Sequence, residues 1–220
     1  MINAKEQQDL LLDISRKLKK KMIVYAVGGT AMMFLGLKDA TKDIDLVFTS
    51  DEDRKEFQRA ATELGYNLFS SIKVYGIKPN QPIMLARGEE RFDLFIKEVI
   101  HFIFSSEMMQ RATSTYEFDV NLILKIADPH DLILMKCATD RLKDKEDVRD
   151  ILKKTTIDWK IIINESLNQL KLGKERAVWD LGTFIDDLVK LKVKIPLDVQ
   201  KTLWKLVQKQ VNEKNSNMKK

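Results

Sequence analysis

Apolar positions in the first part of the chain alternate between helical and strand spacing. A helix is expected over about residues 5–20, because one of its faces collects Leu10, Ile14 and Leu18. A short apolar strand, KMIVYAV, follows, and the glycine pair of GGT then starts a second helix. The next strand is KDIDLVFT, and Ser50 caps a third helix that runs to about residue 64. This alternation predicts an α/β arrangement.

The pattern changes twice further along the chain. Between residues 66 and 126, short segments with strand character are expected at SIKVYGI, PIMLAR, RFDLFI and VNLILKIA, separated by polar stretches. After Pro129 the spacing is helical, with helices expected over about 131–141, 145–153, 158–170, 175–191 and 196–211. We therefore predict an α+β fold, in which a mixed twisted sheet flanked by helices (residues 1–127) precedes a helical bundle (residues 128–220).

Composition narrows the class of protein. Of the 220 residues, 44% are hydrophobic and 32% are charged, as in globular proteins, and no apolar run reaches the length of a membrane helix. The N-terminal sequence lacks the order of a signal peptide, and Cys137 is the single cysteine, so we expect a cytoplasmic location. The net charge of +5 is compatible with binding phosphates but is common in other proteins.

Two aspartates in the second strand carry the chemistry. Side chains alternate along a strand, so Asp43 and Asp45 point to one side while Ile44 and Leu46 pack behind them. Two carboxylates this close repel each other unless a cation lies between them, and Mg²⁺ prefers oxygen ligands of this kind. Asp93, in the strand RFDLFI, again lies between apolar residues. We predict that it joins the pair as a third metal ligand and helps to activate an attacking hydroxyl.

The glycine pair fits the same interpretation. Gly28 and Gly29 lie between a strand and a helix, where free backbone N–H groups attract phosphate, and Thr30 adds a hydroxyl donor. The stretch matches neither a P-loop nor a dinucleotide-binding fingerprint.

The combination of GGT, twelve intervening residues, DID and a later FDLF resembles the signature of the polymerase-β-like nucleotidyltransferase superfamily. KDATKDIDL and HDLILMKCATDRLKDKEDVRDIL are similar to a small prokaryotic branch related to nucleotidyltransferase toxins of abortive-infection systems, and the resemblance covers about residues 23–152. It implies catalysis and metal binding by Asp43, Asp45 and Asp93. It also implies nucleotide binding by Gly28, Gly29, Thr30, Thr41, Lys42 and Lys136, with Asp144 and Asp147 as further candidates.

Members of this superfamily transfer a nucleoside monophosphate from a nucleoside triphosphate to a hydroxyl group and release pyrophosphate, with Mg²⁺ or Mn²⁺ as cofactor. The acceptor varies between RNA or tRNA, proteins and small molecules, and does not follow from the fold. The alternative is a nucleotide-binding or toxin–antitoxin module without transfer activity, with a cognate antitoxin or regulatory protein as partner.

Structural roles compete with these assignments. Asp43 and Asp45 could be exposed acids on a strand edge, and Asp93 could belong to a partly exposed strand. Lys136 could extend its ammonium group from an apolar helix to the surface. Asp144 and Asp147 have helical spacing among basic residues and could form a salt-bridged solvent face.

Overall fold

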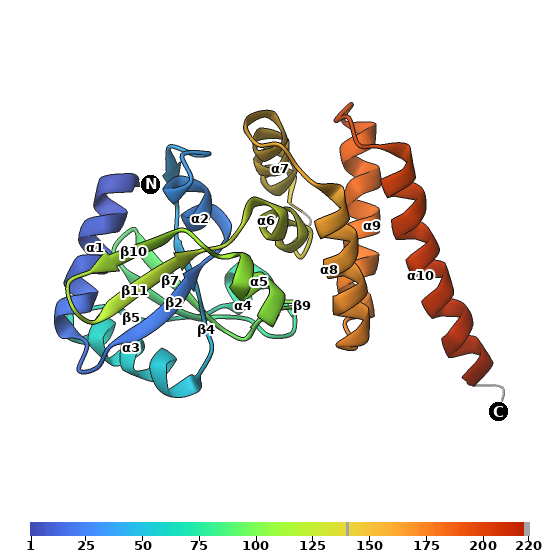
Figure 1. Ribbon diagram of the computed structural model, residues 1–220. Coiled ribbons are helices and arrows are strands. Elements are labelled where there is room, and N and C mark those ends of the chain that lie inside the picture. Colours follow the sequence, from blue (N-terminus) through green and yellow to red (C-terminus); the bar gives the residue numbers. More distant parts are fainter. Residues whose placement is uncertain (140, 218–220) are drawn as a thin grey trace. The chain divides into compact units, whose positions relative to one another are not determined.

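The computed structural model describes residues 1–139 and 141–217, with side chains up to residue 209. Within these residues the chain forms two compact units (Figure 1). The first comprises Met1–Ile100 and Phe104–Asp128, and the second comprises His101–Ile103 and Pro129–Lys220. The division into two domains, residues 1–127 and 128–220, stays a prediction.

The first unit contains a mixed sheet with helices packed against it. Its helices are α1 (Ala4–Lys17), α2 (Gly28–Phe34), α3 (Asp51–Glu63), α4 (Ile72–Tyr75) and α5 (Ser106–Arg111). Its strands are β1 (Ile2–Asn3), β2 (Met22–Ala26), β3 (Ala40–Thr41), β4 (Ile44–Phe48), β5 (Asn67–Phe69), β6 (Ile83–Arg87), β7 (Glu90–Ile96), β8 (Glu98–Val99), β10 (Thr115–Phe118) and β11 (Leu122–Ile126).

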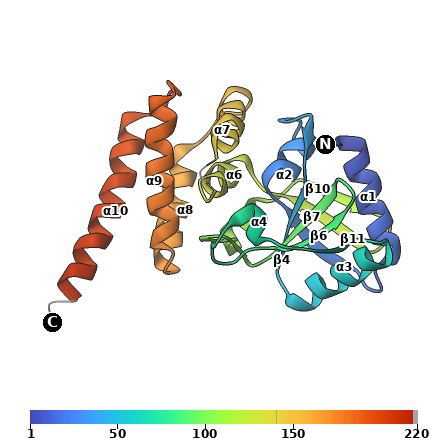
Figure 2. The ribbon, with the colours of Figure 1, turned by 180° about the vertical axis from the view of Figure 1, so that it is seen from behind.

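The main sheet runs in the order β10-β11-β2-β4-β7-β6-β5. The pairs β11–β2 and β4–β7 are parallel and the other neighbouring pairs in this order are antiparallel. Strands β4, β7 and β6 lie side by side in Figure 2. The arrangement places β4 and β7, which are far apart in sequence, next to each other in the middle of the sheet.

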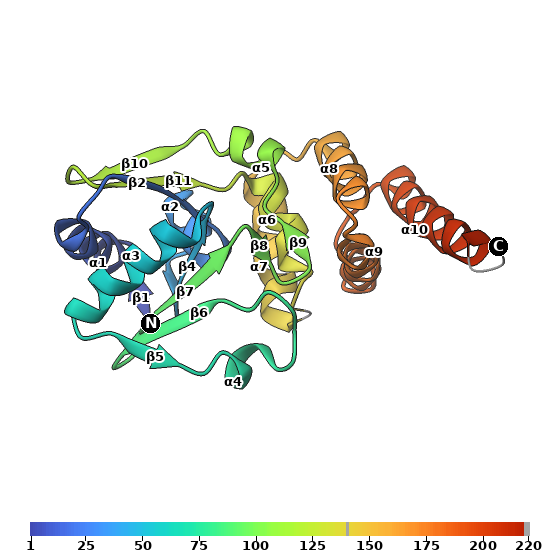
Figure 3. The ribbon, with the colours of Figure 1, turned by 90° about the horizontal axis from the view of Figure 1, so that it is seen from below.

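Helices α1 and α3 lie next to each other against one face of this sheet (Figure 3). An aromatic cluster fills the space under α3, where the ring of Phe57 lies 5.4 Å from both Phe48 and Phe92, and Tyr66 lies 5.0 Å from Phe92. Because side chains alternate along β7, burying Phe92 on this face directs Asp93 to the opposite face. The hydrophobic core thus determines on which side of the sheet the acids lie.

The helix signals of the sequence agree with the structure. Ser50 caps α3, since its hydroxyl oxygen accepts a hydrogen bond of 3.1 Å from the backbone N–H of Asp53. Gly65, which follows the C-cap residue Leu64, has a φ of +88°, which glycine adopts without strain. At the other end of the unit, Asn3 and Glu6 form a capping box that starts α1.

The second unit is helical apart from β9 (Phe102–Ile103). Its helices are α6 (Pro129–Lys136), α7 (Leu142–Lys154), α8 (Trp159–Lys171), α9 (Glu175–Lys190) and α10 (Leu197–Asn217). Helices α8, α9 and α10 pack against one another, and α6 packs against α7 (Figure 1). The predicted α+β class, with a mixed sheet flanked by helices and followed by C-terminal helices, is confirmed.

Three local expectations were wrong. The segment SIKVYGI was predicted as a strand but forms the single helical turn α4, which ends at Gly76 with a φ of +64°. One of the polar stretches, between the expected strands RFDLFI and VNLILKIA, is not only a connection: it contains α5 and β10, because Ser105 caps a short helix there. The helix expected over 131–141 ends at Lys136, and its residue 140 lies outside the described residues.

In the described part of the chain, no helix is long and apolar enough to cross a membrane.

Candidate active site

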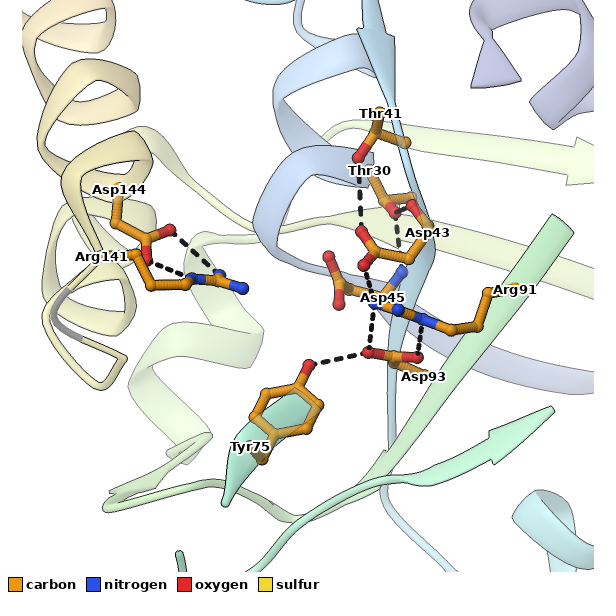
Figure 4. Close-up of polar contacts among 9 residues, drawn as sticks. All are labelled: Thr30, Thr41, Asp43, Asp45, Tyr75, Arg91, Asp93, Arg141 and Asp144. Carbon is orange, nitrogen blue, oxygen red and sulfur yellow. Dashed lines mark hydrogen bonds and ion pairs between the residues drawn. The ribbon is translucent and has the colours of Figure 1, made fainter. Parts of the chain in front are cut away.

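Three carboxylates converge on the sheet face opposite the aromatic cluster. Asp45 of β4 and Asp93 of β7 are direct partners in the parallel register, so their side chains leave the sheet on the same side. Asp43 was expected within this strand but lies in the bend directly before β4, and its carboxylate points toward the other two (Figure 4). One carboxylate oxygen from each of the three lies within 4.8 Å of the others (Figure 4). We call Asp43, Asp45 and Asp93 the acidic triad.

The triad lies at the boundary between core and solvent. Asp93 is fully buried, whereas Asp43 and Asp45 are partly exposed. A fully buried carboxylate requires hydrogen-bond donors or a cation, because taking its charge out of water is costly. An exposed strand edge, the structural alternative for these residues, does not describe this site.

The two glycines of GGT are the first residues of α2 and allow the start of this helix to approach the triad. Gly28 has a φ of +56°, and a Cβ atom at this position would lie 2.4 Å from Oδ2 of Asp45. A Cβ atom on Gly29 would lie 2.4 Å from Oγ1 of Thr41. No other residue type fits at either position without moving its neighbour, so the glycine pair is part of the packing around the acids.

Two threonines fix the start of β4. Thr30 is fully buried, and its hydroxyl oxygen accepts a hydrogen bond of 2.8 Å from the backbone N–H of Asp45. The same hydroxyl lies 3.4 Å from the backbone oxygen of Asp43, to which it donates. Thr41, also buried, donates to Oδ1 of Asp43 at 3.4 Å. Lys42 lies between Thr41 and Asp43 in sequence and is exposed.

Two further residues contact the triad that the sequence did not single out. Arg91 donates from Nε to Oδ1 of Asp93 at 2.8 Å and from Nη2 to Oδ2 at 3.3 Å, and it also forms an ion pair with Asp43. Tyr75 of α4 donates its hydroxyl to Oδ2 of Asp93 at 2.7 Å (Figure 4). The signal for Arg91 was present in RFDLFI, since residues two apart on a strand share a face. For Tyr75 there was none, because it comes from the helical turn that the sequence did not predict.

A family described as "Nucleotidyl transferase of unknown function (DUF2204)" matches residues 7–175. The chain belongs to this nucleotidyl transferase family. The matched range includes the acidic triad, the glycine pair, Arg91 and Tyr75. The resemblance to nucleotidyltransferases that the sequence motifs indicated is thereby confirmed.

The other comparisons add little to this assignment. Among solved structures, the chain is similar to ANT(2")-Ia in complex with adenylyl-2"-tobramycin, with 16% sequence identity and a TM-score of 0.43. The match covers 82% of this chain and 98% of the other. A similarity at this level transfers neither the acceptor nor the chemistry. No curated protein matches the chain significantly.

The ligand atoms of the acidic triad suit a hard divalent cation. The triad offers oxygen atoms only, close together and partly open to solvent. Mg²⁺ and Mn²⁺ favour carboxylate and water oxygens, whereas structural zinc sites use cysteine and histidine. The predicted cofactors are therefore compatible with the residues present.

The predicted residues of the helical part form a cluster within the second unit. Lys136 of α6 lies 3.3 Å from Asp144 of α7 and also pairs with Asp147. Arg141 and Thr139 donate to Asp144 as well, the arginine at 2.8 Å (Figure 4). Lys136, Asp144 and Asp147 are 8%, 1% and 5% exposed. The lysine therefore does not extend its ammonium group to the surface, and the two aspartates do not lie on a solvent face. We call Lys136, Thr139, Arg141, Asp144 and Asp147 the lysine cluster.

Charge compensation is the main electrostatic property of the lysine cluster. Burial by itself raises the pKa of Asp144, but the hydrogen bond from Arg141 and the positive charge of Lys136 outweigh that effect. The pKa of Asp144 therefore lies below its ordinary value of 3.8. The carboxylate stays ionised in a buried place because cations and donors surround it.

Proposed function

We propose that this protein transfers a nucleoside monophosphate from a nucleoside triphosphate to a hydroxyl acceptor and releases pyrophosphate. The observation that carries the proposal is the convergence of Asp45 and Asp93, on two neighbouring central strands, with Asp43, directly before the first of these strands. Membership in a nucleotidyl transferase family supports the reaction class. In the reaction, the acceptor oxygen bonds to the α-phosphorus while the bond from this phosphorus to the bridging oxygen of the leaving pyrophosphate breaks.

The acidic triad would hold the divalent cation, Mg²⁺ or Mn²⁺. When bound, the cation would supply positive charge that polarises the phosphoryl oxygens and neutralises the leaving group. Asp43 and Asp45, which are partly exposed, would bind it from the solvent side. Asp93 would complete the ligand set and would position the acceptor hydroxyl or accept its proton.

The glycine pair and its neighbours would bind the nucleotide. Gly28 and Gly29 bring backbone close to Asp45 and Thr41, and Lys42, next to Thr41 in sequence, is exposed and would contribute its ammonium group. The hydroxyl of Thr30 was predicted to donate a hydrogen bond to phosphate. It instead forms hydrogen bonds with the backbone of Asp43 and Asp45, which supports a positioning role. Nucleotide binding by Lys136, with Asp144 and Asp147 as further candidates, stays a prediction.

The reaction can be tested without knowing the acceptor. The purified protein is incubated with each of the four nucleoside triphosphates, labelled at the α-phosphate, and Mg²⁺ or Mn²⁺. Total tRNA, a protein extract or a pool of small hydroxyl compounds is offered as acceptor. We expect the label to enter one of these pools together with release of pyrophosphate, and both signals to disappear with a chelator.

Asp45→Asn is the decisive variant in this assay, and Asp13→Asn, which removes an exposed acid on α1, is its control. The proposal is wrong if Asp45→Asn transfers as fast as the wild type. Nucleotide that binds but is never transferred would instead favour a nucleotide-binding or toxin–antitoxin module without transfer activity.

A further inference from the structure

We propose that Arg91 is a resident counter-cation that competes with the divalent cation for Asp43 and Asp93. In this role it is a positioning residue that holds the metal-free acids together and raises the metal concentration needed to load the site. The inference rests on the proposed function, because it concerns the same three carboxylates.

The contacts of Arg91 show how it could substitute for a metal ion. Its guanidinium donates hydrogen bonds to both carboxylate oxygens of Asp93, from Nε at 2.8 Å and from Nη2 at 3.3 Å. The same Nη2 pairs with Oδ2 of Asp43. One planar cation thus bridges two members of the triad, as a bound metal ion would.

Electrostatics explains why such a bridge is needed. Carboxylates within 4.8 Å of one another repel, and Asp93 has no exposed surface through which water could stabilise its charge. Arg91 and Asp43 are both only 19% exposed, so their attraction is screened less than that of a surface pair. A guanidinium does not lose its proton at physiological pH and therefore compensates this charge permanently.

The same contacts set Arg91 against a metal ion. Mg²⁺ holds its oxygen ligands at about 2.0–2.1 Å and requires near-ideal octahedral geometry. Each carboxylate oxygen has two lone pairs, but a metal ion that bridges Asp43 and Asp93 would need the space that the guanidinium fills between them, and the two positive charges would repel. Loading the site therefore requires Arg91 to leave at least Asp43, and the free energy of its ion pair is subtracted from the apparent metal affinity.

This competition has a direct functional meaning. A cation that arrives alone has to displace Arg91 with three carboxylates as its only protein ligands. A cation that arrives with a nucleoside triphosphate brings phosphate oxygens as further ligands and offers the displaced guanidinium a new anion to bind. Arg91 would thus favour joint loading of metal and nucleotide over binding of the metal alone.

The test measures Mn²⁺ binding, without nucleotide, by isothermal titration calorimetry and by thermal unfolding. Arg91→Gln is expected to bind Mn²⁺ about tenfold more tightly than the wild type. This change in affinity corresponds to the free energy of one charge-assisted hydrogen bond. Without metal the variant should melt at a lower temperature than the wild type, and Mn²⁺ should raise its melting temperature more. Arg91→Lys, which keeps the charge but not the fork, is expected to lie between the two.

Arg54→Gln is the matched control, because Arg54 is similarly buried, with 16% of its side chain exposed, but pairs with Asp51 on α3. It should leave Mn²⁺ affinity unchanged. A residue with only a structural role would weaken metal binding or leave it unaltered when removed, so equal or weaker binding by Arg91→Gln would overturn the inference.

Asp45→Asn separates this failure from a failure of the proposed function. If Asp45→Asn loses Mn²⁺ binding while Arg91→Gln binds like the wild type, the metal site stands and the role of Arg91 is wrong. If Asp45→Asn and the wild type bind Mn²⁺ equally, the triad is not the metal site and both proposals fail. Should Arg91→Gln not fold, tighter binding by Arg91→Lys would support the inference and unchanged binding would overturn it.

Discussion

The acidic triad and the lysine cluster both gather aspartates in restricted space, yet they differ in exposure to solvent. In the triad, the guanidinium of Arg91 contacts Asp43 and Asp93. In the lysine cluster, Lys136 pairs with both Asp144 and Asp147, and Arg141 also pairs with Asp144. Two members of the triad are partly open to solvent, whereas both aspartates of the cluster are buried. Carboxylates that converge next to solvent suit a site for a cation, and buried aspartates held by basic side chains suit a structural connection.

The largest effect is expected in the triad. Asp45→Asn should lower nucleotidyl transfer by about 10²- to 10³-fold, since a metal ion contributes several kcal/mol to stabilising charge in the transition state. The melting temperature should be unchanged or higher, because one of three repelling charges is gone. Pyrophosphate release and differential scanning fluorimetry measure the two effects. Asp150→Asn, which removes an exposed acid on α7, should leave both unchanged, and a matching loss of transfer in that control would contradict the comparison.

The lysine cluster should respond in stability. Lys136→Met leaves two buried carboxylates without one of their cations, so we expect the free energy of unfolding of the second unit to fall by about 3–5 kcal/mol. The three tryptophans, Trp159, Trp179 and Trp204, all belong to this unit, so their fluorescence in urea reports its unfolding. Lys153→Met, in which the lysine is exposed, is the control. A loss below about 1 kcal/mol would show that the cluster behaves like a surface ion pair.

The glycine next to the triad offers a narrower test. Gly28→Ala and Gly36→Ala both place a side chain at a positive φ, of +56° and +67°, which costs about 1–2 kcal/mol of stability. Nothing lies within 4 Å of a Cβ atom at Gly36, whereas at Gly28 the Cβ atom would collide with Asp45. We therefore expect both variants to melt earlier but only Gly28→Ala to lose transfer. Equal activity of the two would show that the close approach is unimportant.

The smallest effect concerns pH and the lysine cluster. Because the pKa of Asp144 is lower in the folded chain than its ordinary 3.8, ionisation favours folding above that value. This contribution is lost as the pH falls through the folded-state pKa. Asp144→Asn cannot ionise, so its unfolding free energy, followed by tryptophan fluorescence, should fall less steeply below about pH 4 than that of the wild type. Parallel curves would mean that Asp144 does not couple to folding.

Much of the site could be predicted from the sequence because it depends on strand alternation. The pattern of DID and FDL put three acids on one face, and the structure brings their oxygens together. Membership in the nucleotidyl transferase family confirms the family resemblance. The catalytic and binding roles of the individual residues stay predictions.

What the sequence did not show depends on tertiary contacts. The alternation in SIKVYGI favours a strand, but this segment forms the helical turn that brings Tyr75 to Asp93. Lys136 and Asp147 were both found as candidates, yet no local pattern shows that two separate helices would pair them. The spacing of Arg91 and Asp93 on one strand predicts that they share a face, but a basic residue near an acid is too common in sequences to indicate a site.

The central position of β4 and β7 has a consequence for how the site can move. Backbone amides in the middle of a sheet are usually the slowest to exchange with deuterated water, because they open only when much of the unit unfolds. The acids at Asp45 and Asp93 are attached to this rigid backbone, with neighbouring strands on both sides. Adjustment to incoming ligands must then come from rotation of side chains such as Arg91 and from the short turn that carries Tyr75, rather than from the sheet.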